Sequence, residues 1–403
     1  MSSATTIAAL TKMYKTIYHG RDLTNQAKRR TAAYDMVAKY DDFDGAQLVF
    51  PFNYNLPVGV SPSFSLAQAS PTASGFDNWV LSTRKTLYGF LTIDAQAMKA
   101  ARKDIGAFLR VRQKETNEIL SYMKMVLGGH GFWGDGAGDM ARVVSKTGTD
   151  PSTEIVVAQI DVIKFHLNQR LVFNATRTGS AGGIKASVYK VTSVNRLSGA
   201  IGISRVSGSG SGTDPAANDY VYLEGAYDAM PLGVSGVPAT LLGMTRTDDP
   251  VMKAGWRGTW QGSIEESAKY LVALMGQYFD RFNSALWLSD YNWFRLEQEL
   301  TAQGRKVIDA RATQVFGSPA LALLTPGGEI PVVADSYLDN STAFLLDMSA
   351  IEVHHLDNLI HIVDDDGLGL VRQAADDGVE IRFRSWSENM IQRPFKCGRF
   401  PIT

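Results

Sequence analysis

The sequence is poor in cysteine, with Cys397 as the single one among 403 residues. A lone cysteine can form neither an intrachain disulfide nor a paired-thiolate metal site, which suits a reducing compartment and leaves stability to packing or assembly. Long apolar runs are also missing, and the N-terminus lacks the charged and apolar segments of a secretion signal. We therefore expect no membrane-spanning segment and no membrane partner.

The sequence also has no excess of positive or negative charge. The 40 Lys and Arg residues balance 41 Asp and Glu residues, which gives a net charge of −1. This excludes the global basic field of a dedicated nucleic-acid-binding protein, so any contact with nucleic acid has to be local. Lys103, Arg110 and Arg112, at the start of a long predicted helix, are the local candidates. Such a run is typical of a solvated face, and it can also contact phosphates without sequence preference.

The stretch GHGFWG, residues 129–134, has the G-x-G-x-x-G spacing of a nucleotide-binding loop. That fingerprint requires the order strand, glycines, helix. Here a helix comes first, because apolar residues recur at helical spacing from Val111 to Leu127. Gly128 and Gly129 then fit a C-terminal cap in the left-handed conformation. We therefore predict a helix end at this position, and no cofactor.

The strongest enzyme candidate is a metal-dependent hydrolase site formed by His354, His355, His361 and Asp364. Adjacent residues 354 and 355 point to opposite faces of a strand, and the helical H-x-x-x-H spacing is absent. The sequence DDG that follows Asp364 is typical of a hairpin turn between IHIV and LGLV. A structural use of these residues is therefore favoured, and we predict neither a metal site nor an enzyme.

Residues 46–80 combine aromatic, β-favouring residues with several breakers, including Pro57, Gly59 and Pro71. This pattern predicts a long, irregular hairpin. Because an isolated two-stranded ribbon is marginal in water, the hairpin should lie against something else. The hairpin could pack against another chain or against its own domain, and the sequence leaves both alternatives open.

The rest of the chain divides into strand-rich and helical regions. Short β runs with Gly/Ser turns over residues 153–223 predict a compact antiparallel barrel or sandwich. Helical spacing predicts helices over residues 25–39, 264–279 and 287–303. From Val379 onward, apolar and charged residues alternate as in a half-buried strand.

The order of these segments resembles the major capsid proteins of tailed bacteriophages, which have the Hong Kong 97-type shell fold. The resemblance covers most of residues 45–403 and rests on the order and spacing of its pieces. They are AQLVFPFNY to GFDNWV as an extended loop, then VRQKETNEILSYMKMVLGGHGFWGDGAGDMARV as a long spine helix with a glycine-rich turn, then DVIKFHLNQRLVFNAT, ASVYKVTSVNRLSGAI, AANDYVYLEGAY, SIEESAKYLVALM, HIVDDDGLGLVRQ and IRFRSWSENMIQRPFKCGRFPI.

The resemblance implies an α+β Hong Kong 97-like capsid fold with a small inserted β-barrel or sandwich domain. It also implies a division of the chain into an N-terminal arm (1–45), an extended loop (46–92), a peripheral domain with the spine helix (93–150), the inserted β domain (151–235), an axial domain with a return through the peripheral domain (236–364), and an axial loop with C-terminal peripheral strands (365–403).

The function implied is structural: pentamers and hexamers of the chain form an icosahedral head around double-stranded DNA in the virion, assembled in the host bacterial cytoplasm. Implied partners are the chain itself, a separate scaffold, a portal, decoration proteins and packaged DNA. The hairpin would overlie a neighbouring subunit, which accounts for its aromatic residues Phe50, Phe52, Tyr54, Phe64 and Trp79. Lys103, Arg110 and Arg112 would face the DNA.

Two departures from the family pattern shape the expectation. Some members link subunits covalently through a lysine on the extended loop, but no lysine occurs between Lys39 and Lys85. We therefore expect a non-covalent shell. Residues 1–45 are also short for a built-in scaffold, which points to a separate scaffold protein. An encapsulin-like compartment shell, which shares the fold and encloses enzymes, is the alternative within the same fold.

Overall fold

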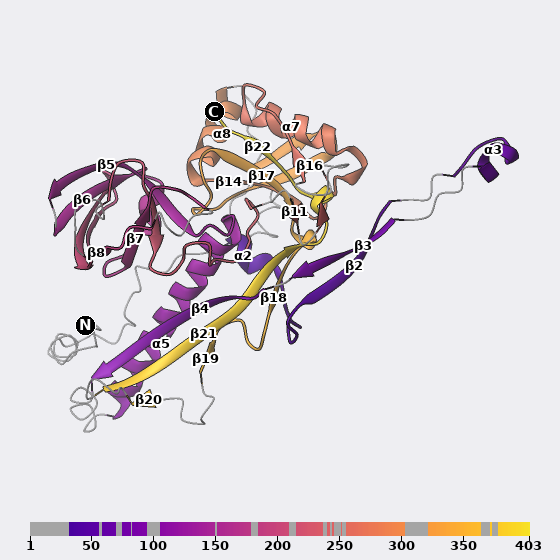
Figure 1. Ribbon diagram of the computed structural model, residues 1–403. Helices are drawn as coiled ribbons and strands as arrows, with labels where there is room; N and C mark the ends of the chain where they lie inside the picture. Colours follow the sequence, from indigo (N-terminus) through magenta and orange to yellow (C-terminus); the bar gives the residue numbers. More distant parts are fainter. Residues whose placement is uncertain are drawn as a thin grey trace.

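The computed structural model describes residues 32–55, 59–69, 75–81, 83–94, 105–149, 151–178, 184–208, 215–236, 240–241, 244–245, 251, 255–302, 321–363, 371–372 and 378–403. Figure 1 shows two sheets with their helices, a barrel to one side and a hairpin that projects from the opposite side.

The first six-stranded sheet is organised around a long strand, β21 (Gly378–Ile391), which pairs with β4 (Lys85–Asp94). Ile381 and Phe383 of β21 are buried against Met123 of the long helix α5 (Ile105–Val126), while Arg382 between them is exposed. The half-buried strand predicted from Val379 onward is therefore confirmed. In the described part of the chain, every helix falls short of the length or apolarity that a bilayer crossing requires.

The remaining strands of this sheet pair directly or indirectly with β21; they are β1 (Ala38–Asp41), β18 (Ile351–His355), β19 (His361–Ile362) and β20 (Val371–Arg372). Both β19 and β20 lie antiparallel to β21, at successive positions along it. His361–Ile362 and Val371–Arg372, the described residues on either side of the predicted hairpin turn, pair with β21. The turn residues themselves, 364–370, lie outside the described residues.

The second six-stranded sheet carries two helices. Its strands, in spatial order, are β13 (Trp256–Arg257), β22 (Gly398–Pro401), β17 (Thr342–Asp347), β14 (Ser284–Leu288), β16 (Gly328–Ala334) and β15 (Leu321–Thr325). Helix α7 (Ile264–Met275) starts at Ser263, whose side chain accepts a hydrogen bond from the Glu266 N–H. The helix predicted from residue 287 starts later, as α8 (Asp290–Ala302), because Trp287 lies in the central, fully buried strand β14.

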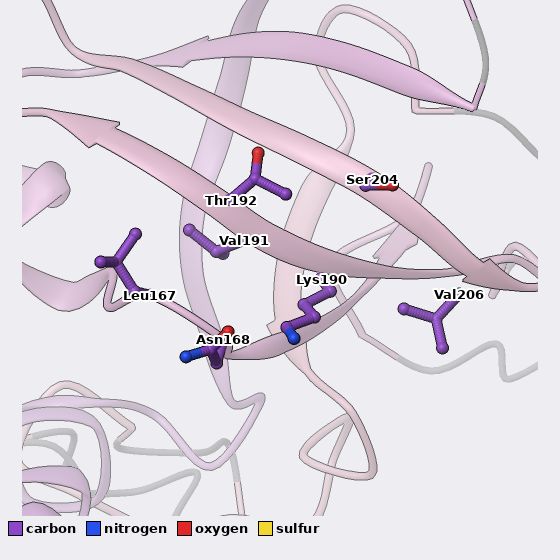
Figure 2. Close-up of a pocket in the computed structure, with 7 residues that line it drawn as sticks. All are labelled: Leu167, Asn168, Lys190, Val191, Thr192, Ser204 and Val206. Atoms are coloured by element: carbon purple, nitrogen blue, oxygen red, sulfur yellow. The ribbon is translucent and has the colours of Figure 1, made fainter. Parts of the chain in front are cut away.

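Residues 139–223 form a closed barrel, one of the two forms predicted for the strand-rich region. Its strands run in the order β10 (Tyr220–Leu223), β5 (Asp139–Thr149), β6 (Ser152–Val157), β9 (Ala200–Ser207), β8 (Val188–Asn195) and β7 (Arg170–Asn174). The alternating sequence places Phe173, Tyr189 and Ile201 in a core of its own. Figure 2 shows the outer wall of β8 and β9, where Lys190 and Ser204 lie.

The predicted hairpin is also present. Strands β2 (Leu48–Asn55) and β3 (Gly75–Leu81) pair as an antiparallel ribbon with a register shift after Asn53, and a short helix, α3 (Phe64–Ala69), lies beyond their paired ends. In Figure 1 this hairpin extends away from both sheets. A second, very short ribbon is formed by β11 (Thr240–Leu241) and β12 (Met244–Thr245).

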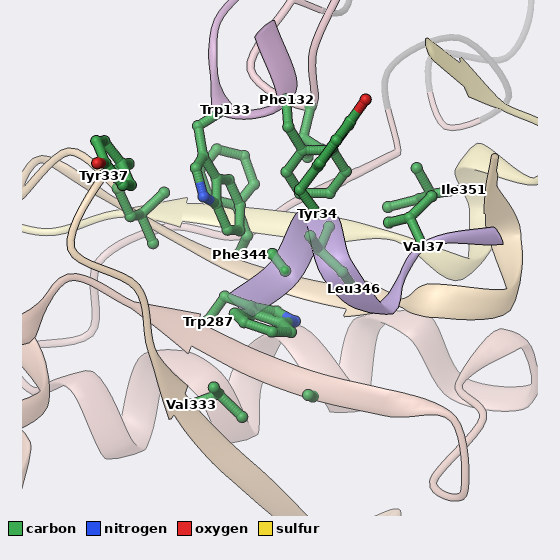
Figure 3. Close-up of a cluster of buried hydrophobic side chains, with 14 of the residues drawn as sticks. Tyr34, Val37, Phe132, Trp133, Trp287, Val333, Tyr337, Phe344, Leu346 and Ile351 are labelled. Atoms are coloured by element: carbon green, nitrogen blue, oxygen red, sulfur yellow. The ribbon is translucent and has the colours of Figure 1, made fainter. Parts of the chain in front are cut away.

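A large apolar cluster joins the two sheets to the N-terminal helix α2 (Ala32–Met36). Tyr34 of α2 is buried next to Phe132, and Trp133 lies 5.9 Å from Trp287 between ring centroids. Figure 3 shows these rings gathered between α2, the turn after α5 and the second sheet. The helix predicted up to Lys39 ends earlier, at Met36, because the following residues pair in parallel with β18.

The glycine-rich turn after α5 differs from the predicted cap. Gly128 and Gly129 continue the helix as a π-helical turn, Leu127–Phe132, and the positive φ angles occur later, at Gly136 (85°) and Gly138 (82°). Gly129 serves close packing instead, since a Cβ there would lie 2.6 Å from the Tyr337 ring. A phosphate loop requires a strand before its glycines and a helix after them. Here helix α5 comes before the glycines, as the sequence predicted.

Candidate subunit-contact surfaces

The tip of the hairpin exposes apolar side chains. Val60, Phe64 and Leu66 are 89%, 82% and 62% exposed, and none of the residues of α3 is buried. Isolated exposed apolar residues are common, but here three of them lie on one short projecting segment. The tip lies far from the sheets in Figure 1, so these side chains are available to a second molecule.

The five predicted contact aromatics are not equivalent. Phe64 is at the exposed tip, whereas Phe50 is half-buried at the other end of the hairpin, with its ring 5.0 Å from that of His354. There it packs against the buried residues of the hairpin root. Phe52 and Tyr54 lie in β2, and Trp79 lies in β3 opposite Phe50; their side chains are outside the described set.

Of the three basic residues predicted to face DNA, two lie in the described part of the chain. Arg110 and Arg112 are in α5, and Lys103 precedes the described part of that helix. The side chains of these three residues are outside the described set, so their DNA-facing role stays a prediction.

The histidines of the hydrolase hypothesis have separate structural partners. His354 lies 2.8 Å from Asp42, whereas Nδ1 of His355 contacts the Asp357 carbonyl and Nδ1 of His361 contacts the Asn358 carbonyl. Across the described residues, no group of three or more His, Cys, Asp or Glu side chains could hold a metal ion. Asp364 is outside that set. Each of the three histidines has its own local contact in the described part of the chain.

A buried polar junction connects β21 to the glycine-rich turn. The Glu388 carboxylate accepts hydrogen bonds from the backbone N–H groups of Leu232 and Asn389, and the Asn389 amide donates to the carbonyls of Gly131 and Leu232. Burial raises the pKa of Glu388 to about 7, against the lowering effect of these hydrogen bonds. The sequence analysis missed this junction, although the polar run SWSEN interrupts the apolar alternation of the strand.

A single arginine ties the barrel to the same turn. Arg177 contacts Asp135 of the turn at 2.7 Å and Asp139, at the start of β5, at 3.1 Å. Both carboxylates are mostly buried, whereas the arginine is 45% exposed. The two contacts join the segment after β7 to the turn after α5 and to the start of β5.

Replacing Arg177 with alanine should loosen this connection. We expect faster hydrogen exchange over residues 135–140, and a loss of about 1 kcal/mol in the free energy of unfolding, because the pairs are partly solvated. The matched control is Arg170→Ala, which removes the more exposed pair with Glu224 within the barrel. Equal exchange over residues 135–140 in the two variants would contradict the assignment.

The outer wall of the barrel carries a shallow pocket of about 440 Å³ (Figure 2). Leu167 and Val206 line its two sides, and Lys190 is its single ionisable residue. Its other polar lining residues are Asn168, Thr192 and Ser204.

The fold is similar to that of solved phage capsid structures, although sequence comparisons find no match. No protein-family model matches the sequence, and no curated protein is similar to it. Among solved structures, the cyanophage A-1(L) capsid asymmetric unit aligns with a TM-score of 0.53 at 9% identity, over 99% of both chains. The capsid of an empty GTA particle aligns with a TM-score of 0.50 at 8% identity, over 98% of both chains. The chain therefore has the fold of phage capsid proteins, which confirms the resemblance predicted from the order of its segments.

Proposed function

We propose that this chain is a major capsid protein of the Hong Kong 97 type, which assembles as pentamers and hexamers into an icosahedral head around double-stranded DNA. The observation that carries the proposal is the hairpin: a capsid-type body extends an arm whose tip residues Val60, Phe64 and Leu66 stay exposed within the described part of the chain. Such an arm gives a shell subunit an additional contact with a neighbour, and shell stability comes from the contacts between neighbouring chains.

The same proposal assigns roles to the other parts. Residues 46–92 are the extended loop, residues 93–150 contain the spine helix, and the barrel is an insertion between this helix and an axial domain that includes α7 and α8. The N-terminal end of the spine helix, with Lys103, Arg110 and Arg112, faces the packaged DNA. Further partners are a separate scaffold, a portal and decoration proteins, and the assembled protein is part of the virion, built in the host cytoplasm. The role is structural and requires no cofactor or catalysis.

Electron microscopy with light scattering tests the proposal directly. The chain is expressed alone and together with the scaffold protein that accompanies it in the host. Uniform hollow particles, or rings of five or six subunits, are the expected result, and nucleic acid inside particles from infected cells separates a phage head from an enzyme compartment. A persistent monomer under both conditions would overturn the proposal.

The hairpin tip provides a sharper prediction. A Phe64→Asp, Leu66→Asp double variant should raise the concentration needed for assembly by about 100-fold or more, because it removes two apolar side chains from each contact and adds buried charge. Val144→Asp is the matched control, since Val144 is 63% exposed on the barrel. Both variants should remain folded, and assembly is measured by light scattering. Assembly of the double variant at the wild-type concentration would show that the tip is not a subunit contact.

A further inference from the structure

Helix α7 exposes apolar side chains on the side that faces away from the second sheet. Ala268, Leu271 and Met275 are buried in the core that α7 and α8 share with this sheet. Tyr270 and Leu274 point away from that core, because they lie about 200° and 240° around the helix from Ala268. Their exposed fractions are 39% and 37%. Charged residues are usual at such positions of a solvated helix, so this apolar face indicates a partner.

The segment after α7 exposes further apolar side chains. Tyr278 and Phe282 are 41% and 81% exposed, and they line a pocket of about 400 Å³ together with Phe395. The guanidinium of Arg281, which is also exposed, lies 4.6 Å from the centre of the Phe282 ring. Arg281 therefore places a positive charge beside an apolar surface, the α7 patch, which consists of Tyr270, Leu274, Tyr278 and Phe282.

Helix α8 exposes a second patch at its N-terminal end. Tyr291 and Phe294, which we call the α8 patch, are 60% and 52% exposed and lie three residues apart on one side of the helix. Asp290, the exposed first residue of the helix, places a negative charge beside this patch. The nearby Arg295 contacts Glu299 at 3.4 Å, so its charge is compensated within the helix.

The two patches lie at opposite ends of the central strand β14. Phe282 comes two residues before β14 begins, whereas Tyr291 comes three residues after it ends. A strand of this length spans about 13 Å. Both helices cover the same face of the second sheet (Figure 1). One chain therefore presents two separate apolar surfaces on different flanks of its axial domain.

The charges beside the two patches are complementary. Arg281 lies at the α7 patch and Asp290 lies at the α8 patch. Lys396, which lines the same pocket as Arg281, lies 3.5 Å from Asp280 and 3.0 Å from the buried Asp347, so its charge is balanced within the chain. Opposite charges beside two apolar surfaces select a partner and fix its register. A second copy of the chain supplies the matching surface for each patch.

We propose that the α7 patch of one chain binds the α8 patch of a second copy, with Arg281 of the first beside Asp290 of the second. Because the two patches differ, the contact is heterologous, and each chain can bind one copy through each patch. Repetition of such a contact closes into a ring when the rotation between copies allows it. The inference rests on the proposed function, since it identifies the surfaces through which the axial domains form a ring. It is separate from the contact of the hairpin tip.

Charge reversal in the full-length chain tests the pairing. Arg281→Asp and Asp290→Arg each place like charges at every contact, so each should raise the concentration needed for assembly by about tenfold or more, measured by light scattering. The double variant Arg281→Asp, Asp290→Arg restores opposite charges and should assemble close to the wild-type concentration. A double variant that assembles no better than the single variants would overturn the proposal.

Apolar variants test the two patches independently of this ion pair. The double variants Leu274→Asp, Phe282→Asp and Tyr291→Asp, Phe294→Asp should each raise the concentration needed for assembly by about 100-fold or more, because they replace buried apolar contacts with charge. Leu197→Asp, at a residue of the barrel that is 87% exposed, is the matched control and should assemble as the wild type. Circular dichroism should show that all variants are folded, since every replaced side chain is exposed.

The result for the wild type separates this inference from the proposed function. If wild-type chains form particles and the variants of both patches assemble at the same concentration, the patches are not subunit contacts, although the chain still forms a shell. A wild-type chain that stays monomeric would overturn both the inference and the proposed function.

Discussion

Replacing Gly233 with alanine is expected to cost about 4 kcal/mol or more in the free energy of unfolding, and to yield mostly misfolded protein. A Cβ at this position would lie 2.4 Å from the carbonyl oxygens of Gly131, Phe132 and Gly134. All three atoms belong to the backbone of the turn after α5, so no side-chain rotation relieves the clash. The loss is measured by denaturant unfolding of the soluble fraction.

Gly131→Ala is the matched control within the same junction. Its Cβ would lie 3.5 Å from Pro231, an ordinary van der Waals distance, and the position is helical. We therefore expect Gly131→Ala to remain within about 1 kcal/mol of the wild type. If Gly233→Ala were as stable as Gly131→Ala, the segment that contains Gly233 would have to pass the turn after α5 along a different path.

Replacing Glu388 with glutamine should change the pH dependence of stability. Because burial raises the pKa of Glu388 to about 7, the folded chain keeps a proton that the unfolded chain loses at lower pH. Stability should therefore fall as the pH rises from about 4.5 to about 7, by roughly 3 kcal/mol in total. Glutamine stays neutral and still offers an oxygen to the N–H groups of Leu232 and Asn389, so the variant should be more stable than the wild type above pH 7 and equal to it in acid.

Denaturant unfolding at several pH values measures this difference. Glu154→Gln, at an exposed position on β6, is the control and should leave the pH dependence unchanged. A Glu388→Gln variant with the wild-type pH dependence would mean that the carboxyl is already ionised in the folded chain.

Much of the fold followed from local patterns. The helical spacing before Gly128, the alternation in β21 and the close spacing of strands in the barrel are all encoded within windows of about 20 residues, where periodicity is informative. The exposure of Phe64 could also be predicted locally, because a short segment between helix- and strand-breaking residues is rarely buried in a hydrophobic core.

The buried sites could not be predicted in the same way. Asp42 meets His354 across 312 positions in sequence, and Leu232 meets Glu388 across 156. The role of Gly129 depends on Tyr337, which belongs to the second sheet. The sequence identifies a glycine or a carboxylate, but the structural role of that residue depends on the distant segment that packs against it.

The closed barrel has a consequence for the evolution of the chain. Asp139 at its entrance and Tyr222 near its exit are paired neighbours, so the chain enters and leaves within about 5 Å. Its core is also separate from those of the two sheets. A gene could therefore gain, lose or exchange this module by a single insertion event, because the ends of the surrounding chain would stay where they are.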